Sequence, residues 1–242
     1  MAKAFVRSTQ SMHGMETVAL DLLKLLKQKY DYNTLSRMTG LPVSTLNRYI
    51  KNKTIPQTQK AKKLIERVSP LINMTELIKE KALIGQDDVN IYEIVSNPSL
   101  IKIINFFIVS EFSGSKLTAI MPLDVHSIPL SAVLATTIDR RMLLLSERPL
   151  WDDDEAITLT YRIPDFVEKF KLWLPKDAVS SKDSVLMISS FLITDSLVSS
   201  AVHMLNKKGA SVVGLFSIVA REQFWKKVLL PPGSRKKCLL LV

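Results

Sequence analysis

The chain has few of the features that mark secreted or membrane proteins. Only one of its 242 residues, Cys238, is a cysteine, so no internal disulfide can form. A lone cysteine is typical of proteins from reducing compartments. Residues 1–11 lack the apolar core of a signal peptide. The apolar tract at 100–109 is interrupted by Lys102 and Asn105 and is too short to span a bilayer, so we expect a cytoplasmic protein.

The positive charge of the chain is concentrated in its first third. Hydrophobic residues make up 47% of the sequence and charged residues 23%, which is typical of a globular protein. Of the net charge of +10, residues 1–81 supply most, with 15 Lys and Arg against 6 Asp and Glu, whereas residues 82–242 carry 18 against 17. A basic segment joined to a neutral body is typical of a nucleic-acid-binding head. A lysine-rich helix face in solvent would give the same counts.

The basic segment has the pattern of a small helical domain. Apolar residues at helical spacing predict four helices, at 16–29, 34–39, 42–51 and 57–68. Pro42 suits the first turn of the third helix, and Thr39-Gly40-Leu41 before it predicts a tight turn. Two short helices joined by such a turn form a helix-turn-helix. The segment 35–50 resembles the helix-turn-helix of many prokaryotic regulators.

An ordinary three-helix packing unit is the alternative that this pattern leaves open. If the unit is a helix-turn-helix, its exposed polar side chains would contact double-stranded DNA. Arg48 has the donors to bind guanine O6 and N7, and Asn47 suits adenine N6 and N7. Small hydroxyls suit a backbone phosphate. The predicted DNA contacts are Arg37, Ser44, Thr45, Asn47, Arg48 and Lys51.

The rest of the chain predicts an α/β domain. Strands alternate with helices through 98–220, which indicates a largely parallel sheet. The alternating residues 157–163 predict a strand, and 165–170 a short helical turn or the end of a hairpin. Ser69-Pro70 suggests a boundary. The predicted organisation is a helix-turn-helix domain at 1–69, a connector at 70–95, and a ligand-sensing and dimerisation domain at 96–242.

The most informative stretch of the second domain is 185–206. Val185 to Ile188 form a short apolar run, as expected of a parallel strand that is covered on both faces. Thr194-Asp195-Ser196 then supplies small polar groups where a helix begins, and Gly209 suits the C-cap of that helix. Backbone N–H groups and the positive end of the helix dipole would face this loop. The stretch therefore predicts a phosphate cradle.

The segment 170–217, built on this stretch, resembles the core of a type I phosphoribosyltransferase domain. In that family a hydrophobic strand leads into two adjacent acidic residues and then into a Thr/Gly-rich loop. The loop holds the 5′-phosphate of phosphoribosyl pyrophosphate (PRPP). The corresponding loop here is 193–197. The resemblance implies a ligand site formed by Ser189, Ser190, Thr194, Asp195, Ser196, Leu197, Val198, Ser199, Asp124, His126 and Ser127.

The sequence departs from the family where the chemistry is carried. Ser189 and Ser190 replace the acidic pair, whose carboxylates would stabilise an oxocarbenium-like ribose. Asp195 in the phosphate loop would repel a phosphate unless it pointed away. The loop at 122–127, which binds pyrophosphate in the family, lacks the usual glycine and basic residue. We therefore expect a domain that binds a ribose phosphate but does not catalyse transfer, with no metal or cofactor.

These observations favour a DNA-binding transcription regulator whose second domain senses PRPP or a nucleotide monophosphate. Helix-turn-helix proteins usually bind paired half-sites, which predicts a homodimer. Two alternatives remain. One is an active phosphoribosyltransferase with an accessory nucleic-acid-binding domain, for which Asp195 would be the only local replacement acid. The other is a regulator whose second domain only dimerises.

Overall fold

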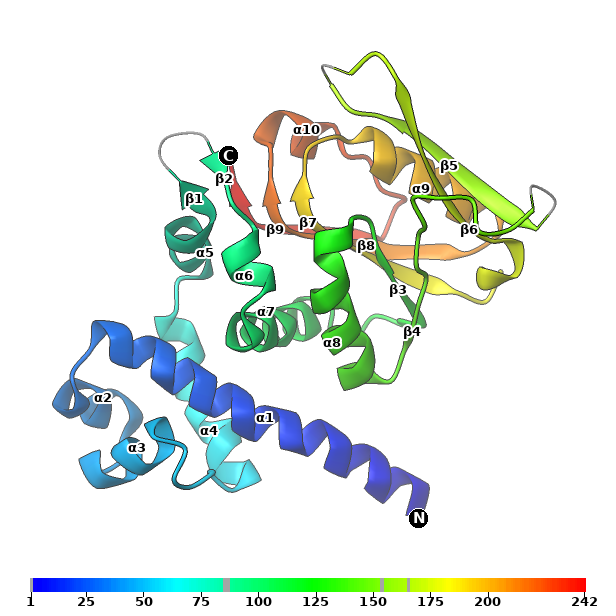
Figure 1. Ribbon diagram of the computed structural model, residues 1–242. Helices are drawn as coiled ribbons and strands as arrows, with labels where there is room; N and C mark the ends of the chain where they lie inside the picture. Colours follow the sequence, from blue (N-terminus) through cyan, green and yellow to red (C-terminus); the bar gives the residue numbers. More distant parts are fainter. Residues whose placement is uncertain (1, 85–87, 153–154, 165) are drawn as a thin grey trace.

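The computed structural model describes residues 2–84, 88–152, 155–164 and 166–242, with side chains from Gly14 onward except that of Ile84. A long first helix runs beneath the sheet domain, and three shorter helices pack at its end (Figure 1). These helices are α1 (Ala2–Lys29), α2 (Tyr32–Thr39), α3 (Val43–Ile50) and α4 (Thr58–Val68). α1 begins at Ala2, well before the predicted start at residue 16. The prediction began at residue 16 because the helical spacing of apolar residues starts only there.

The turn between α2 and α3 is held by local contacts. Asp31 caps α2 by accepting a hydrogen bond of 2.7 Å from the backbone N–H of Thr34. Gly40 ends the helix with a φ of 70°, a left-handed conformation that favours glycine. Arg67 of α4 donates to the carbonyl of Thr39 at 2.7 Å. On α3, Leu46 and Tyr49 are buried, and Ile50 is half-buried against the same core.

The connector is structured and joins the helical head to the sheet. It contains a 3₁₀ turn at Ser69–Leu71, helix α5 (Met74–Ala82) and a short antiparallel pair, β1 (Leu83–Ile84) with β2 (Asp88–Val89). Helix α6 (Tyr92–Val95) then leads into α7 (Pro98–Glu111). Asn73 caps α5 by accepting from the N–H of Glu76.

The body is built on a five-stranded parallel sheet. Its strand order is β4-β3-β7-β8-β9, and every neighbouring pair is parallel. The strands are β4 (Arg141–Met142), β3 (Ala119–Pro122), β7 (Ser184–Leu192), β8 (Ser211–Ala220) and β9 (Arg235–Leu241). β7 and β8 lie in the middle and are buried along almost their whole length, as expected of strands covered on both faces. The prediction of an α/β fold with a largely parallel sheet is confirmed.

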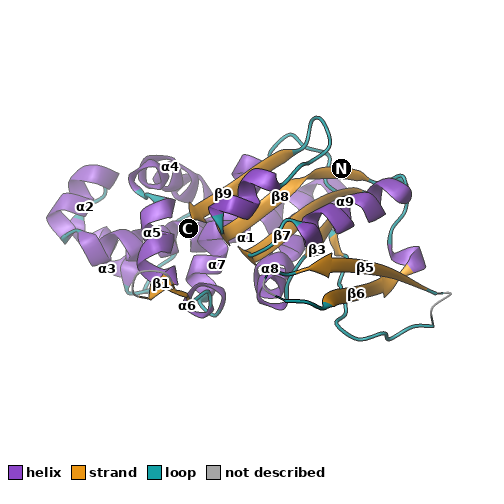
Figure 2. Cartoon of the chain, turned by 90° about the horizontal axis from the view of Figure 1, so that it is seen from above, coloured by secondary structure: helices purple, strands orange, loops and turns teal. Residues whose placement is uncertain are grey.

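Helices cover both faces of the sheet (Figure 2). One face packs on α7 (Pro98–Glu111), α8 (Ile128–Ile138) and the head, which share one hydrophobic core with residues such as Ile188 and Phe216. The other face packs on α9 (Ser196–Lys207) through residues such as Met187 and Leu215. A short helix, α10 (Glu222–Lys227), connects β8 to β9. Among the described residues no helix combines the length and apolar character needed to cross a membrane.

A two-stranded hairpin lies apart from the main sheet and packs on α9 (Figure 1). Its strands are β5 (Ala156–Arg162) and β6 (Lys169–Pro175), paired antiparallel. Of the two structures predicted for 165–170, a helical turn or the end of a hairpin, the hairpin is confirmed at Lys169 and Phe170, which begin β6; residue 165 lies outside the described residues. The strand forms because Phe170, Leu172 and Leu174 alternate with exposed residues and share the face of Tyr161 and Leu159.

Candidate functional site

The carboxyl ends of β3 and β7 bring three of the predicted ligand residues together. Asp124 follows β3, and Ser189 and Ser190 lie near the end of β7. The hydroxyl of Ser189 donates to Asp124 Oδ2 at 3.1 Å, and that of Ser190 donates to Oδ1 at 2.5 Å. The backbone N–H of Ser190 also donates to Oδ2, at 2.9 Å. A carboxylate therefore stands beside the two serines, although it comes from another strand.

Asp124 is held in place from its own side as well. It begins a short 3₁₀ turn, Val125–Ser127, and accepts a hydrogen bond of 2.9 Å from the N–H of Ser127. The hydroxyl of Ser127 accepts a hydrogen bond from the backbone N–H of Asp124, and the two reciprocal bonds form a capping box. With the bonds from Ser189 and Ser190, the two carboxylate oxygens accept four hydrogen bonds. This number fills the acceptor sites of an ionised carboxylate.

Asp124 lies at the wall of a pocket of about 230 Å³. Most of its lining is apolar, and Glu147 supplies a second carboxylate. Among the described residues that line it there is no Lys or Arg. Burial raises the pKa of Tyr161, and the nearby charges of Glu147 and Asp124 raise it further. The residues that line the pocket are Pro122, Leu123, Asp124, Val125, Ile128, Leu145, Glu147, Tyr161, Ile163, Leu172, Ser189, Phe191, Leu192, Ile193, Thr194 and Leu197.

The predicted phosphate loop, 193–197, lies between this pocket and the hairpin. The hydroxyl of Thr194 donates to the carbonyl of Arg162 at 2.8 Å. The N–H of Arg162 donates to the hydroxyl of Ser196 at 3.1 Å. Ser196 begins α9, and its own N–H donates to the Thr194 hydroxyl at 3.2 Å. The loop is thus in direct contact with the last residue of β5.

The other predicted ligand residues do not all reach the pocket. Val198 is buried in the core beneath α9. Ser199 is exposed in a separate groove between α9 and β5. His126 is exposed on the turn after Asp124, and Asp195 makes no side-chain cap at the start of α9. The residues that sequence reasoning missed are Glu147 and Tyr161. Both come from segments whose placement depends on the hairpin.

Most of the predicted DNA-contacting side chains of the head are open to solvent. Arg37, Ser44, Arg48 and Lys51 are exposed, and Thr45 is half-buried. Beside α3, a groove of about 270 Å³ is lined by Lys60, Lys63 and Arg67 of α4. Positive charge therefore lies next to the polar face of α3.

Asn47 is the exception on that face. Its side-chain oxygen accepts a hydrogen bond of 3.3 Å from the hydroxyl of Tyr32, and the residue is half-buried. Reading adenine would require this oxygen to accept from the base N6 amino group. The bond to Tyr32 would have to be shared or released for that contact.

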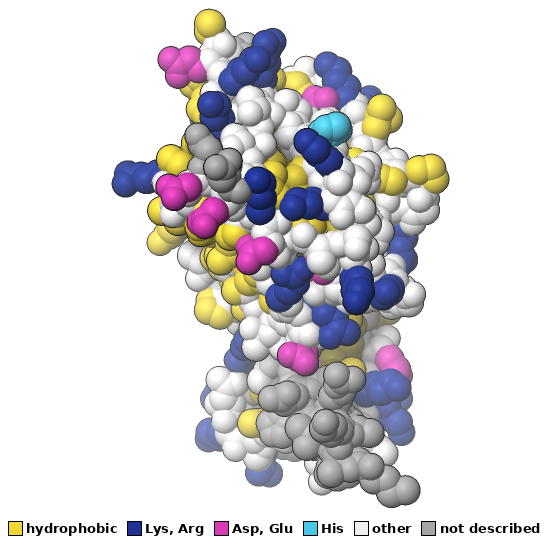
Figure 3. Space-filling view, turned by 90° about the vertical axis from the view of Figure 1, so that its right-hand side faces the viewer, with side chains coloured by type: hydrophobic (Ala, Val, Ile, Leu, Met, Phe, Trp, Pro, Cys, Tyr) yellow, Lys and Arg dark blue, Asp and Glu magenta, His cyan; other side chains and the backbone are white. Residues whose placement is uncertain are grey.

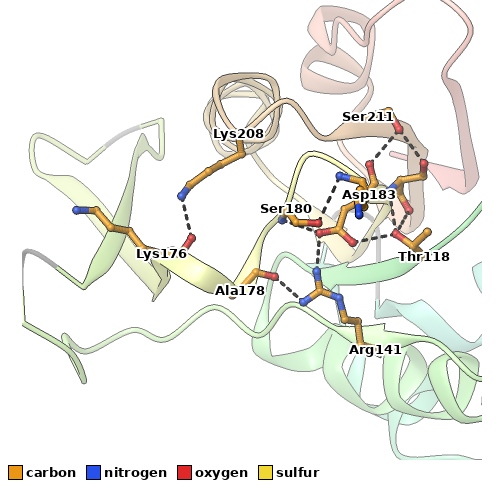
Figure 4. Close-up of polar contacts among 10 residues, drawn as sticks. Thr118, Arg141, Lys176, Ala178, Ser180, Asp183, Lys208 and Ser211 are labelled. Atoms are coloured by element: carbon orange, nitrogen blue, oxygen red, sulfur yellow. Dashed lines mark hydrogen bonds and ion pairs between the residues drawn. The ribbon is translucent and has the colours of Figure 1, made fainter.

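A second polar cluster lies at the opposite, amino-terminal ends of β3 and β7 (Figure 4). Asp183 accepts hydrogen bonds from Arg141 at 2.5 Å, from the backbone N–H of Ser180 at 2.8 Å and from the hydroxyl of Thr118 at 3.1 Å. Burial raises the pKa of Asp183, but these bonds and the Arg141 charge outweigh it and hold the pKa below its ordinary value. Every group in the cluster is used within the protein, so its role is to tie the strands together.

The fold is that of known enzymes. No family model and no curated protein sequence matches the chain. Among solved structures, it is similar to the adenine phosphoribosyltransferase of Thermoanaerobacter pseudethanolicus, with a TM-score of 0.60 and 15% identity over 69% of this chain and 99% of that one. The enzyme of Rhodothermus marinus gives 0.59 and 15%, over 70% and 98%. That of Trypanosoma brucei, in complex with AMP, pyrophosphate and ribose-5-phosphate, gives 0.58 and 15%, over 69% and 79%.

These similarities correct the expectation that the second domain is not an enzyme. That expectation rested on the replacement of the acidic pair by Ser189 and Ser190. The solved structures named above are adenine phosphoribosyltransferases, which are enzymes. The sequence offered Asp195 as the only local replacement acid; in the structure another carboxylate, that of Asp124, contacts both serines. The chain therefore contains a domain with the fold of the phosphoribosyltransferases.

Proposed function

We propose that this chain is a phosphoribosyltransferase with an accessory nucleic-acid-binding head. Its substrates would be a phosphoribosyl donor such as PRPP and a base, and its product a nucleotide monophosphate. The observation that carries the proposal is the position of Asp124. Its carboxylate is hydrogen-bonded to Ser189 and Ser190, the residues that stand where the family has its acidic pair.

The chemistry of transfer asks for negative charge beside the ribose. The bond between ribose C1′ and the pyrophosphate oxygen breaks, and its electron pair leaves with pyrophosphate. A bond between C1′ and a base nitrogen then forms, and the proton on that nitrogen passes to the departing pyrophosphate or to water. Positive charge develops on the ribose in between, and a fixed carboxylate stabilises it without reorganising. Asp124 and Glu147 supply such charge at the pocket wall.

The serines can link Asp124 to a ribose hydroxyl through hydrogen bonds. Its acceptor sites are filled, so it would not bind ribose hydroxyls directly. Ser189 lines the pocket and uses its hydroxyl proton toward Asp124, which leaves its oxygen lone pairs to accept from a ribose hydroxyl. A chain of hydrogen bonds from ribose through serine to carboxylate polarises each member. The 5′-phosphate would lie at the loop 193–197 and the N-terminal end of α9.

Binding of ribose 5-phosphate and AMP, measured by isothermal titration calorimetry, tests the site. We expect both to bind to the wild-type chain and to raise its melting temperature, since a ligand specific for the folded state must do so. Asp124→Asn should fold but bind less well, because an amide disturbs the four hydrogen bonds. Asp177→Asn, at an exposed carboxylate outside the pocket, is the matched control. Equal binding by wild type and D124N would remove Asp124 from the site.

A DNA-binding transcription regulator is the second candidate, favoured by the exposed polar face of α3. Its second domain would bind PRPP or a nucleotide, and the signal would reach the head through α1, which packs on both α4 and α7. Two copies would form a homodimer that binds paired half-sites in double-stranded DNA. In this function Arg37, Ser44, Thr45, Asn47, Arg48 and Lys51 would contact the DNA.

Fluorescence anisotropy with duplex DNA from upstream of the protein's own gene tests the head. Arg48→Ala should weaken binding to a preferred site by about 1–3 kcal/mol and affect random DNA less. Lys226→Ala, at an exposed lysine of α10 on the body, is the control. If wild-type binding is no tighter than that of the control protein albumin at the same salt concentration, the head does not bind DNA.

A further inference from the structure

The outer edge of β5 is bonded to the start of α9 rather than to another strand. Its inner edge pairs with β6. On the outer side, Thr194 and Ser196 bond the carbonyl and the N–H of Arg162. The hydroxyl of Ser200, one turn further along α9, donates to the carbonyl of Thr160 at 2.5 Å. Three side chains from one loop and helix therefore fasten the hairpin edge.

Two of these three side chains belong to the predicted phosphate loop. A bound phosphate would offer oxygen acceptors to the hydroxyls of Thr194 and Ser196 and to N–H groups at the start of α9. In the structure the acceptor that meets the Thr194 hydroxyl is the Arg162 carbonyl. The Ser196 hydroxyl is already an acceptor for the Arg162 N–H. The hairpin backbone therefore uses the Thr194 hydroxyl proton that a phosphate needs, whereas the Ser196 hydroxyl keeps its proton and is bound to the hairpin only as an acceptor.

We propose that the β5 edge is an autoinhibitory contact, and that a ligand phosphate must displace the Arg162 carbonyl from the Thr194 hydroxyl in order to bind. The proposal rests on the proposed function, because it takes the loop 193–197 as the phosphate site. The hairpin and the phosphate then compete for the Thr194 hydroxyl proton, and the bond from the Arg162 N–H to Ser196 holds the Arg162 carbonyl in place. Because binding and release are linked, the ligand loosens the hairpin edge, and a looser edge raises the affinity for the ligand.

The charges around the hairpin favour the replacement of the Arg162 contact by a phosphate. Arg162 lies directly opposite Lys169 on β6, and Lys171 lies two residues further along, all three exposed. Like charges directly opposite each other destabilise a strand pair. Figure 3 shows Lys and Arg side chains, with Asp and Glu side chains among them, on the side of the molecule that carries the hairpin. The three cations at Arg162, Lys169 and Lys171 would attract an arriving phosphate.

A proline at position 162 tests the contact with little change elsewhere. The N–H of Arg162 points toward Ser196, and in an antiparallel pair such an N–H takes no part in the bonds to β6. Arg162→Pro therefore removes one fastening bond and keeps the hairpin ladder. Arg162→Ala is the matched control, because it removes the same side chain but keeps the N–H. The probe is ribose 5-phosphate, followed by calorimetry and by hydrogen exchange of peptides from 156–162.

We expect the proline variant to bind ribose 5-phosphate about three- to tenfold more tightly than the alanine variant, because the loss of one hydrogen bond that fastens the edge makes the Arg162 carbonyl easier to displace. In the wild-type chain the ligand should speed exchange in 156–162. If the ligand binds to wild type but leaves this exchange unchanged or slows it, the autoinhibitory contact is overturned and the proposed function stands. If neither wild type nor the proline variant binds the ligand, both fall.

Discussion

Asp183, which lies away from the candidate site, shows how much a single carboxylate can contribute to the free energy of unfolding. Its hydrogen bonds join the starts of β3 and β7 to Arg141 (Figure 4). Asp183→Ala should lower the free energy of unfolding by about 2–3 kcal/mol, since it leaves several polar groups unpaired. Urea unfolding at neutral pH measures this loss. Asp177→Ala, at an exposed aspartate of the neighbouring turn, should change stability by less than about 0.5 kcal/mol.

The same residue predicts a dependence on pH. Because the pKa of Asp183 is lower in the folded chain than in the unfolded chain, its stabilisation is complete above the unfolded pKa of about 4. It is lost as the pH falls through the folded value. Wild type should therefore lose more stability than Asp183→Ala between pH 5 and the onset of acid unfolding, roughly pH 3. Parallel pH curves for the two proteins would contradict the shift.

Alanine variants at Gly40 and Gly114 separate the cost of backbone strain from the cost of a steric clash. Both have a left-handed φ, of 70° and 77°. A Cβ on Gly40 would lie 2.6 Å from the Arg67 guanidinium, whereas one on Gly114 would have no atom within 4 Å. Gly114→Ala should cost about 1 kcal/mol from strain alone. Gly40→Ala should cost more and should also weaken DNA binding, since it pushes Arg67 away from the turn. Equal thermal shifts for the two variants would mean that Arg67 moves freely.

For single residues, the sequence predicts where a side chain lies along a strand better than it predicts which other side chains it contacts. Asp124, Ser189 and Ser190 could all be placed at the ends of strands from the apolar runs before them. Their contact could not be predicted, because Asp124 lies 65 residues before Ser189 and depends on β3 pairing with β7. The inference that catalysis was lost came from treating the serines alone. In the structure the carboxylate of Asp124, which follows a neighbouring strand, contacts both of them.

Helix α1 is the element on which head and body meet. It packs on α4 of the head and on α7 of the body. Its buried Asp21 accepts a hydrogen bond of 3.0 Å from the Ser99 hydroxyl and lies 3.5 Å from Lys102 Nζ, both on α7. Asp21→Ala should therefore cost about 1–3 kcal/mol, because Ser99 and Lys102, both half-buried on α7, lose their acceptor.

Thermal unfolding measures the Asp21 effect, with Glu80→Ala as control. Glu80 forms an exposed pair with Lys29 at 3.9 Å and should contribute less than about 0.5 kcal/mol. The argument requires a larger drop for Asp21→Ala than for Glu80→Ala. If both variants melt at the wild-type temperature, the polar contact between α1 and α7 contributes nothing to holding the head.

Element prediction succeeded where periodicity was strong and failed where it was not. The helices α2, α3 and α4 lie within a few residues of their predicted positions, and β7 contains the predicted apolar run 185–188. β6 was missed in part because its charged residues, Lys169 and Lys171, obscure the alternation of Phe170 and Leu172. The hairpin then determines where Tyr161 lies, so missing β6 also meant missing that side of the pocket.

For the molecule as a whole, the account joins a parallel-sheet domain with the phosphoribosyltransferase fold to a basic helical head. Their cores are continuous, from Val18 and Leu22 in α1 to Phe216 in β8. Through this core the sheet packs against α1, and α1 in turn packs on α2 and α3. If the proposed function is correct, ligands of the pocket and DNA should influence each other's affinity by the same factor.

The measurement that tests the central claim most directly is pyrophosphate release from PRPP in the presence of Mg²⁺ and single nucleobases. The account predicts release that depends on the base and that falls by about 100-fold or more in Asp124→Asn, as expected when charge at the reacting centre is lost. Asp177→Asn should retain the wild-type rate. Release at the rate of a protein-free mixture, from a wild-type chain that is folded by circular dichroism, would contradict the claim.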